Sequence, residues 1–195
     1  MQAFYDQELP TRGGLMAGSP RLRRLEQFVE ASRSSGSRTV LEVGAGAGHD
    51  GALIRGAGLA YVAVDLSVVG ARLCRERGLD AVQASATALP FAADSFDAAW
   101  SMSTLMHLPA EDILVALREL RRVVRAGGLL EVGVWGADTD GVFINDEGRY
   151  FRRRTDARVS ELLGRVGVLV AFETWDHLTG GRHYQWGRVV VSEKG

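Results

Sequence analysis

The sequence has almost no cysteine and almost no lysine. Cys74 is the one cysteine among 195 residues, so the chain cannot form an internal disulfide, which favours a reducing compartment. Lys194 is the one lysine, and its position at the tail leaves no lysine to act as a catalytic base. The 23 basic and 24 acidic residues give a net charge of −1, which provides no overall field for binding nucleic acid or an anionic membrane.

Long apolar runs are absent too. The longest, near Val62 and Val168, fall far short of the roughly 18 residues that a membrane helix needs, and residues 1–20 lack the pattern of a signal peptide. Hydrophobic residues make up 46% and charged residues 24% of the chain, which is typical of a soluble globular domain. We therefore expect a cytoplasmic protein of one domain, with neither a membrane nor a nucleic acid as partner.

Short β-branched runs alternate with helical patterns along most of the chain. Strands are expected at residues 39–43, 61–64, 81–84, 96–100 and 129–135, and helices at residues 20–33, 67–77, 109–125 and 156–165. This alternation indicates an α/β fold with a parallel sheet covered on both faces. Gly127-Gly128 is expected to end the helix at 109–125. Residues 168–174 and 185–191 should pair as an antiparallel hairpin on the sheet edge, because only a loop separates them.

Three alternating glycines stand where the first strand passes into a helix. The missing side chains of Gly44, Gly46 and Gly48 let a ligand approach the backbone and the amides at the helix start. The dinucleotide fingerprint G-x-G-x-x-G would need glycine or alanine at position 49, which is His49. No Gly-Lys-Ser/Thr sequence occurs, which excludes a nucleoside-triphosphate P-loop.

An acidic residue ends the second expected strand. Asp65 follows Gly48 by 17 residues, about the interval that places a carboxylate against a ribose diol. A carboxylate there accepts two parallel hydrogen bonds from the two hydroxyls. The alternative for the same residues is a plain strand-to-helix turn, with Asp65 capping the next helix.

Four ordered runs together are more specific than any one of them: residues 40–48 (VLEVGAGAG), 62–67 (VAVDLS), 88–97 (ALPFAADSFD) and 120–129 (LRRVVRAGGL). With these runs the chain resembles the class I S-adenosylmethionine-dependent methyltransferase family over roughly residues 38 to 135. The resemblance implies a doubly wound, seven-stranded, mostly parallel sheet with a reversed last strand, in agreement with the antiparallel C-terminal edge hairpin. It also implies S-adenosylmethionine as cofactor and S-adenosylhomocysteine as its product.

The resemblance also implies which residues contact this cofactor. The three glycines approach its methionine portion, Asp65 binds the ribose hydroxyls and Leu66 packs near the adenine. Ser85 and Ala86 stand where the family usually has an acidic and a small residue beside the adenine, a departure that would lower affinity without abolishing the site. The expected cofactor-binding residues are Glu42, Gly44, Gly46, Gly48, Asp65, Leu66, Ser85, Ala86 and Ser101.

Methyl transfer is an in-line displacement, so the protein mainly has to align the acceptor with the methyl group. His107, in the loop after the fourth strand, is the expected catalytic residue, because its pKa suits a general base near neutrality. The alternative is a packing or capping role beside the next helix. No group of histidine, cysteine and acidic residues has metal-ligand spacing, so no metal is expected.

The acceptor site is expected outside the shared core. Tyr5, Arg12, Phe143 and Tyr150 are the expected substrate contacts, because aromatic and polar side chains together are typical of small-molecule pockets. The expected substrate is a small-molecule metabolite that receives the methyl group on oxygen, nitrogen or carbon.

The expected organisation is one methyltransferase domain with three parts. Residues 1–37 form an N-terminal helical cap, residues 38–135 the cofactor-binding core, and residues 136–195 a lid segment, the last helix and the edge hairpin. The lid is small, so a homodimer is one expected way of completing it. Two alternative functions stay open, an NAD-dependent oxidoreductase and a non-catalytic S-adenosylmethionine-binding protein.

Overall fold

The computed structural model describes residue 6 and residues 18–193. The strands are β1 (Thr39–Val43), β2 (Ala60–Asp65), β3 (Asp80–Gln83), β4 (Phe96–Met102), β5 (Val124–Ala137), β6 (Gly141–Ile144), β7 (Tyr150–Arg153), β8 (Gly167–Leu178) and β9 (Arg182–Val191). The helices are α2 (Pro20–Ser34), α3 (His49–Gly56), α4 (Val68–Glu76), α5 (Asp112–Val123) and α6 (Asp156–Gly164), with a 3-10 turn η2 (Leu105–His107). Strands and helices alternate from β1 to β3 and again from β4 to β5, and no helix lies between β3 and β4.

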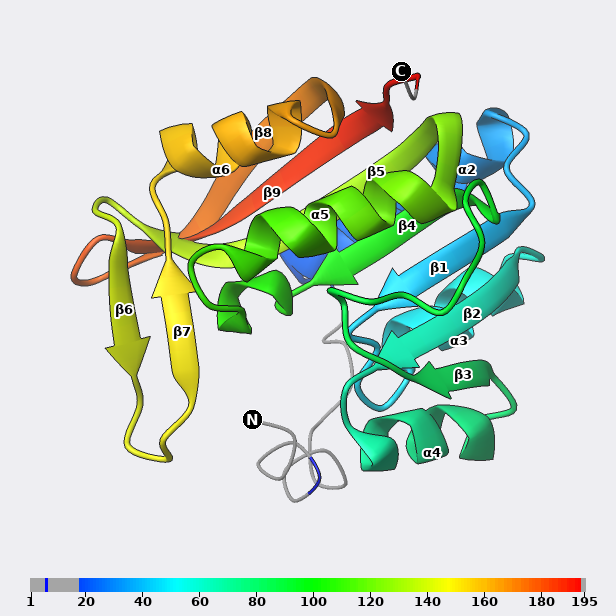
Figure 1. Ribbon diagram of the computed structural model, residues 1–195, viewed down its shortest axis with the longest axis horizontal. Helices are drawn as coiled ribbons and strands as arrows, with labels where there is room; N and C mark the ends of the chain where they lie inside the picture. The colour runs from blue at the N-terminus through cyan, green and yellow to red at the C-terminus, as the bar shows by residue number, and fades with distance from the viewer. Residues whose placement is uncertain (1–5, 7–17, 194–195) are drawn as a thin grey trace.

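Seven strands form one sheet in the order β3-β2-β1-β4-β5-β9-β8. Neighbouring strands from β3 to β5 are parallel, whereas β9 is antiparallel to both β5 and β8. The last strand is therefore inserted beside β5, and β8 becomes the edge of the sheet (Figure 1). The predicted fold class, a doubly wound and mostly parallel sheet with an antiparallel C-terminal hairpin, is confirmed.

Helices cover both faces of this sheet. Figure 1 shows α5 and α6 in front of it, and their residues Leu117 and Leu162 belong to the hydrophobic core of that face. The core of the other face includes Phe28 of α2, Ile54 of α3 and Cys74 of α4, all of them fully buried. Among the described residues, no helix combines the length and apolarity needed to cross a bilayer.

Serine side chains cap two of the helices. The Ser19 hydroxyl accepts a hydrogen bond from the backbone N–H of Leu22 (3.2 Å), and Pro20 takes the first helical position of α2. The Ser67 hydroxyl accepts from the N–H of Gly70 (3.0 Å) at the start of α4. The second cap fixes the chain just beyond Asp65.

The helix expected at 109–125 is wrong at both ends. The observed α5 spans Asp112–Val123, and the two glycines do not end it. Val124 already pairs with Phe96 of β4, and regular pairing resumes only at Leu129. Between them the chain bulges, with Gly127 at φ +73° and so little space that a Cβ on Gly128 would lie 2.5 Å from a carbonyl oxygen. The glycines therefore serve the abrupt change from helix to strand.

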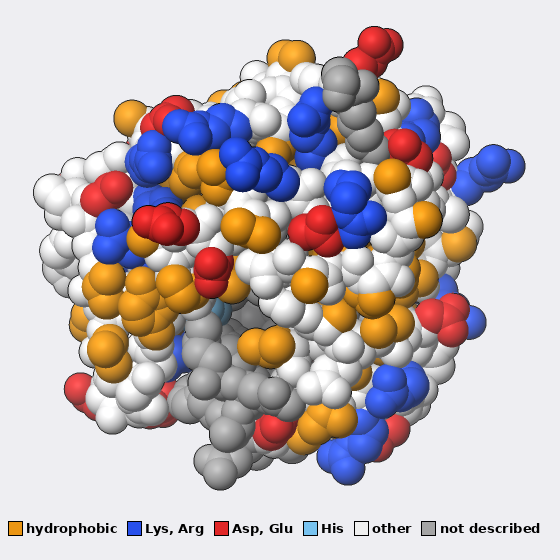
Figure 2. Space-filling model, viewed as in Figure 1, with side chains coloured by type: hydrophobic (Ala, Val, Ile, Leu, Met, Phe, Trp, Pro, Cys, Tyr) orange, Lys and Arg blue, Asp and Glu red, His pale blue; other side chains and the backbone are white. Residues whose placement is uncertain are grey.

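A second, two-stranded sheet was not predicted. Strands β6 and β7 pair antiparallel and form a hairpin between β5 and α6, inside the segment expected as a lid. In Figure 1 this hairpin extends from the left side of the molecule, beside η2. Its residues Val142, Phe143 and Ile144 are exposed, and Figure 2 shows hydrophobic side chains gathered over the hairpin.

Candidate functional site

The three glycines form the turn between β1 and α3 in left-handed conformations. Their φ angles are +81° at Gly44, +55° at Gly46 and +78° at Gly48, which other residues adopt only with strain. A Cβ on Gly44 would lie 1.9 Å from the Thr104 hydroxyl oxygen, so the loop after β4 packs directly on the turn. The sequence did not single out Thr104, although it lies in the loop expected to border the site.

Asp65 connects the end of β2 to this turn. One carboxylate oxygen accepts a hydrogen bond from the Gly46 N–H (2.7 Å), and the other accepts from the Ser67 N–H (2.8 Å). Asp65 therefore lies against the glycine turn, as expected of a residue that binds part of the same ligand. Asp6 reaches the same place, because its carboxylate accepts a hydrogen bond from the Ser67 hydroxyl and a longer one from the N–H of Val69 (3.4 Å).

The residues expected near an adenine lie at the ends of β2 and β3, which pair in parallel. The Leu66 side chain is 42% exposed, so an apolar surface is open beside Asp65. The N–H of Ala84 donates to the carbonyl oxygen of Asp65 (3.0 Å), which holds the following Ser85 and Ala86 beside it. Both residues are half-buried, and the Ser85 hydroxyl hydrogen-bonds the Thr87 hydroxyl (2.7 Å).

Two buried carboxylates lie beneath the glycine turn. Glu42 is 1% exposed and accepts a hydrogen bond from the Tyr61 hydroxyl (2.5 Å). Burial, followed by the negative charge of Asp50, raises the pKa of Glu42 well above its ordinary value. Asp50 is 2% exposed and lies in the first turn of α3. Burial at this end of the sheet therefore disfavours the charged form of Glu42.

Asp50 joins α2 to the sheet through contacts that the sequence did not reveal. Its carboxylate accepts hydrogen bonds from the Arg21 guanidinium and the Trp100 indole N–H, both at 2.7 Å. Arg21 also lies 3.5 Å from the Ser103 hydroxyl, which in turn hydrogen-bonds the Tyr184 hydroxyl (3.1 Å). These residues come from four separate stretches of the chain, so no sequence spacing could have grouped them.

Ser101 is fully buried in β4, and its hydroxyl donates to the Val43 carbonyl oxygen (2.9 Å). This bond ties the ends of β1 and β4 together just before the glycine turn. The position supports the cofactor site from below, and direct contact between the Ser101 hydroxyl and a cofactor stays a prediction.

His107 ends η2 and is 4% exposed. Its Nδ1 lies 2.8 Å from the carbonyl oxygen of Tyr150, so Nδ1 carries a proton there, and its Nε2 lies 3.0 Å from the Arg149 guanidinium. The edge of the ring meets Phe151, with 4.7 Å between ring centroids. The loop after β4 is thereby bound to the β6–β7 hairpin.

The expected substrate contacts are only partly described. Tyr5 and Arg12 lie outside the described residues. Phe143 is in β6 and Tyr150 begins β7, so both belong to the hairpin that holds His107. The ring of Phe143 lies 6.0 Å from that of Phe151, which links it to the same aromatic contact.

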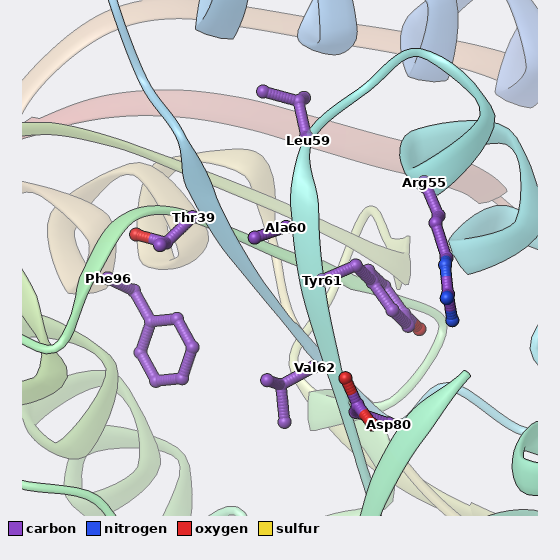
Figure 3. A pocket seen from close by; sticks show the side chains of 8 residues that line it. All are labelled: Thr39, Arg55, Leu59, Ala60, Tyr61, Val62, Asp80 and Phe96. Carbon is purple, nitrogen blue, oxygen red and sulfur yellow. The ribbon is translucent and has the colours of Figure 1, made fainter.

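The part of the chain that the structure describes contains no group of histidine, cysteine and acidic residues that could hold a metal. An open hollow of about 240 Å³ lies at the other end of the sheet, where β1 to β4 begin (Figure 3). Its lining residues are Thr39, Arg55, Leu59, Ala60, Tyr61, Val62, Asp80 and Phe96. Ligand sites of parallel α/β sheets lie at the carboxyl ends of the strands, so this hollow is not the candidate site.

Known proteins resemble the chain over the same region. Residues 41–132 match the methyltransferase domain family. A demethylmenaquinone methyltransferase of Renibacterium salmoninarum is 36% identical over 146 residues, which cover 73% of this chain and 59% of that protein. A tRNA (carboxymethyluridine(34)-5-O)-methyltransferase of Arabidopsis thaliana is 33% identical over 81 residues, 41% of this chain and 20% of that protein. The chain spans about half the length of the curated relatives it matches.

Solved structures share the fold at lower identity. The 1,6-didemethyltoxoflavin-N1-methyltransferase of Burkholderia thailandensis, solved with 1,6-didemethyltoxoflavin and S-adenosylhomocysteine, superposes with a TM-score of 0.70. It is 23% identical and covers 87% of this chain and 78% of its own. This likeness confirms the sheet and its helices rather than any particular residue of the site.

Proposed function

We propose that this chain, which belongs to the class I S-adenosylmethionine-dependent methyltransferases, transfers a methyl group to an oxygen, nitrogen or carbon atom of a small-molecule metabolite. The observation that carries the proposal is the contact between the Asp65 carboxylate and the Gly46 N–H (2.7 Å). It brings a carboxylate suited to a ribose diol and a turn open to close backbone approach into one site.

The residues present fit this cofactor. Gly46 brings a residue without a side chain against Asp65, Asp65 has the acceptor oxygens for two hydroxyls, and exposed Leu66 offers a surface for an adenine. Buried Glu42, whose pKa is raised, would ionise more readily beside a positive group of the ligand, whereas Asp50 is already paired with Arg21. When bound, S-adenosylmethionine supplies the methyl group on a positively charged sulfur.

The chain's own contribution to the reaction is alignment and the handling of one proton. The loop after β4 packs on the glycine turn through Thr104 and on the hairpin through His107, so it borders the expected positions of both cofactor and acceptor. His107 would accept the proton at Nε2, and Arg149 has to release that atom first, because Nδ1 faces the Tyr150 carbonyl oxygen and Nε2 accepts a hydrogen bond from Arg149 (3.0 Å).

A small-molecule acceptor agrees with the charge of the chain. Its net charge of −1 gives no field for a polyanion, and the segment next to His107 is a short hairpin rather than an added domain. RNA is the second candidate, because one of the relatives acts on tRNA. A screen with radiolabelled S-adenosylmethionine against a metabolite pool and against total tRNA separates the two acceptor classes.

Calorimetric titration tests the cofactor site. S-adenosylmethionine and S-adenosylhomocysteine should bind and NADH should not, whereas binding of NADH alone would favour an oxidoreductase. Asp65→Ala should weaken the binding of S-adenosylhomocysteine by about 1.5–3 kcal/mol, the scale of hydrogen bonds to a charged group. Asp80→Ala removes an equally charged group at the start of β3 and should leave the affinity unchanged. Equal affinities of the two variants would contradict the role of Asp65, and tight cofactor binding without transfer to any acceptor would favour a non-catalytic protein.

A further inference from the structure

Five half-buried arginines on the main sheet and its helices bind a carboxylate, whereas Arg121 donates to the backbone carbonyl oxygen of Glu193 (2.7 Å). Arg21 pairs with Asp50 (2.7 Å), Arg122 with Glu119 (2.7 Å) and Arg188 with Glu131 (2.6 Å). Arg24 and Arg125 likewise pair with Glu173 and Asp97. In these five pairs a guanidinium that loses water on folding is given an anion.

Four arginines at the base of the β6–β7 hairpin differ from these. Arg152, Arg153 and Arg154 end the hairpin and Arg182 begins β9, and none of them is exposed enough to be fully hydrated. Within residues 18–193 and residue 6, none of the four forms an ion pair with a carboxylate. Arg154 donates instead to the carbonyl oxygens of Arg152 (3.2 Å) and Ala110 (3.4 Å), so backbone groups satisfy it.

Arg153 has no such substitute. Its Nε is buried without a hydrogen-bond partner, and its guanidinium lies over the Phe143 ring, 4.3 Å from the ring centroid. Loss of hydration, followed by repulsion from Arg182, lowers the pKa of Arg153. A guanidinium stacked on a ring still has N–H donors along its edge that can bind an oxyanion. A bound oxyanion would replace the lost hydration and offset the repulsion from Arg182.

The direction of this arginine relates it to the proposed acceptor site. In the β6–β7 pairing, Phe143 stands opposite Phe151 and Gly141 opposite Arg153, so these side chains share one face of the hairpin. Phe151 on that face also meets His107. Contacts therefore run from His107, which is 4% exposed, through Phe151, whose ring lies beneath the Arg149 guanidinium (5.0 Å), and through Phe143 to the guanidinium of Arg153.

We propose that the methyl acceptor carries an oxyanion, a carboxylate or a phosphate, and that Arg153 together with Arg182 binds it while the acceptor's body lies along Phe151 and Phe143. This inference rests on the proposed methyltransferase function and adds the chemical class of the substrate. The oxyanion fixes the end of the acceptor that is remote from His107, and the other end is turned toward the methyl group.

Three small probes of similar shape test the proposal. Benzoate, phenyl phosphate and benzamide are titrated into protein loaded with S-adenosylhomocysteine, and the Nε–H resonance of Arg153 is followed by NMR. That resonance is assigned by its loss in Arg153→Gln. Benzoate or phenyl phosphate should shift it and bind at least about 10-fold more tightly than benzamide, the scale of one charge-assisted hydrogen bond. Whichever of benzoate and phenyl phosphate binds more tightly indicates whether the acceptor carries a carboxylate or a phosphate.

The variants separate this site from general charge effects. Arg153→Gln and Arg182→Gln should each lower the affinity for the anionic probe about 10-fold and leave the affinity for benzamide unchanged. Arg152→Gln is the matched control, because Arg152 pairs with Val142 on the opposite face of the hairpin and its loss removes the same charge. Equal binding of benzoate, phenyl phosphate and benzamide would overturn the inference, as would equal losses in all three variants. Failure of S-adenosylhomocysteine itself to bind would instead contradict the proposed function.

Discussion

The two ends of the parallel strands use acidic side chains in opposite ways. At the amino end, the Asp97 carboxylate accepts hydrogen bonds from the N–H groups of Arg38 (2.8 Å) and Thr39 (3.0 Å) and from the Arg125 guanidinium (2.6 Å). At the carboxyl end, Glu42 is buried with a tyrosine hydroxyl as partner and with Asp50 nearby. The first acid is satisfied as an anion, whereas the second is held where its charge is disfavoured.

The same division appears in the pKa values and explains where a ligand belongs. Burial raises the pKa of Asp97, but the bonds from Arg125, Arg38 and Thr39 outweigh burial and lower it well below its ordinary value. Burial raises the pKa of Glu42, and no arginine bonds to it directly. The amino end is thus complete without a ligand, while the carboxyl end gains when a positive group arrives.

The largest difference between the ends should come from replacing a glycine. Gly44→Ala would place a methyl group on the Thr104 side chain at φ +81°, and should destabilise the fold by about 3 kcal/mol and abolish measurable binding of S-adenosylhomocysteine. Gly127→Ala at the amino end has a similar φ of +73°, but its nearest neighbour would be 3.9 Å away. It should cost only about 1–2 kcal/mol of left-handed strain and keep full cofactor affinity.

Thermal unfolding and calorimetry of the two variants measure these effects. If Gly127→Ala weakened cofactor binding as much as Gly44→Ala does, a general loss of stability would explain both results. The close approach of the loop after β4 to the glycine turn would then have no special part in binding.

Asp97→Ala should affect stability and leave the ligand site intact. It removes the acceptor for two backbone N–H groups and for Arg125, so we expect a loss of about 2–3 kcal/mol. Because the pKa of Asp97 is lowered on folding, its contribution is present above about pH 4 and is lost as the pH falls further. Urea unfolding at pH 7 and at pH 3 should therefore show a smaller difference between variant and parent at pH 3. A cofactor affinity reduced more than about twofold at pH 7 would contradict the separation of the two ends.

The sequence predicted the sheet because its signals are local. Runs such as 39–43 and 61–64 have the composition of buried strands, and both form strands of the main sheet. The length of α5 was predicted wrongly because the pairing of Val124 with Phe96 overrides a helical pattern that continues to Arg125. The strands β6 and β7 were missed because each has only four residues and little alternation of apolar and polar side chains.

The site was predictable only where it is continuous in sequence. The glycine turn and Asp65 belong to two adjacent motifs, and the structure brings them into contact. Arg21 and Thr104 were missed because each acts through a partner distant in the chain, Asp50 and Gly44 respectively. The Ser101 hydroxyl bonds to β1, which a strand pattern cannot reveal.

Glu42→Gln should change the pH dependence of stability in the opposite direction to Asp97→Ala. The amide oxygen can still accept the Tyr61 hydrogen bond, so the variant removes a titrating group while keeping its shape. Since folding raises the pKa of Glu42, the parent's stability from this group is complete below about pH 4 and is lost as the pH rises through the raised value. The free energy of unfolding of the variant should therefore rise relative to that of the parent as the pH rises. The slope is at most about 1.4 kcal/mol per pH unit, the limit for one proton. Urea unfolding from pH 5 to pH 9 measures this gain. A constant difference would mean that Glu42 is ionised in the folded protein, and that the carboxyl end, like the amino end, already holds a satisfied anion.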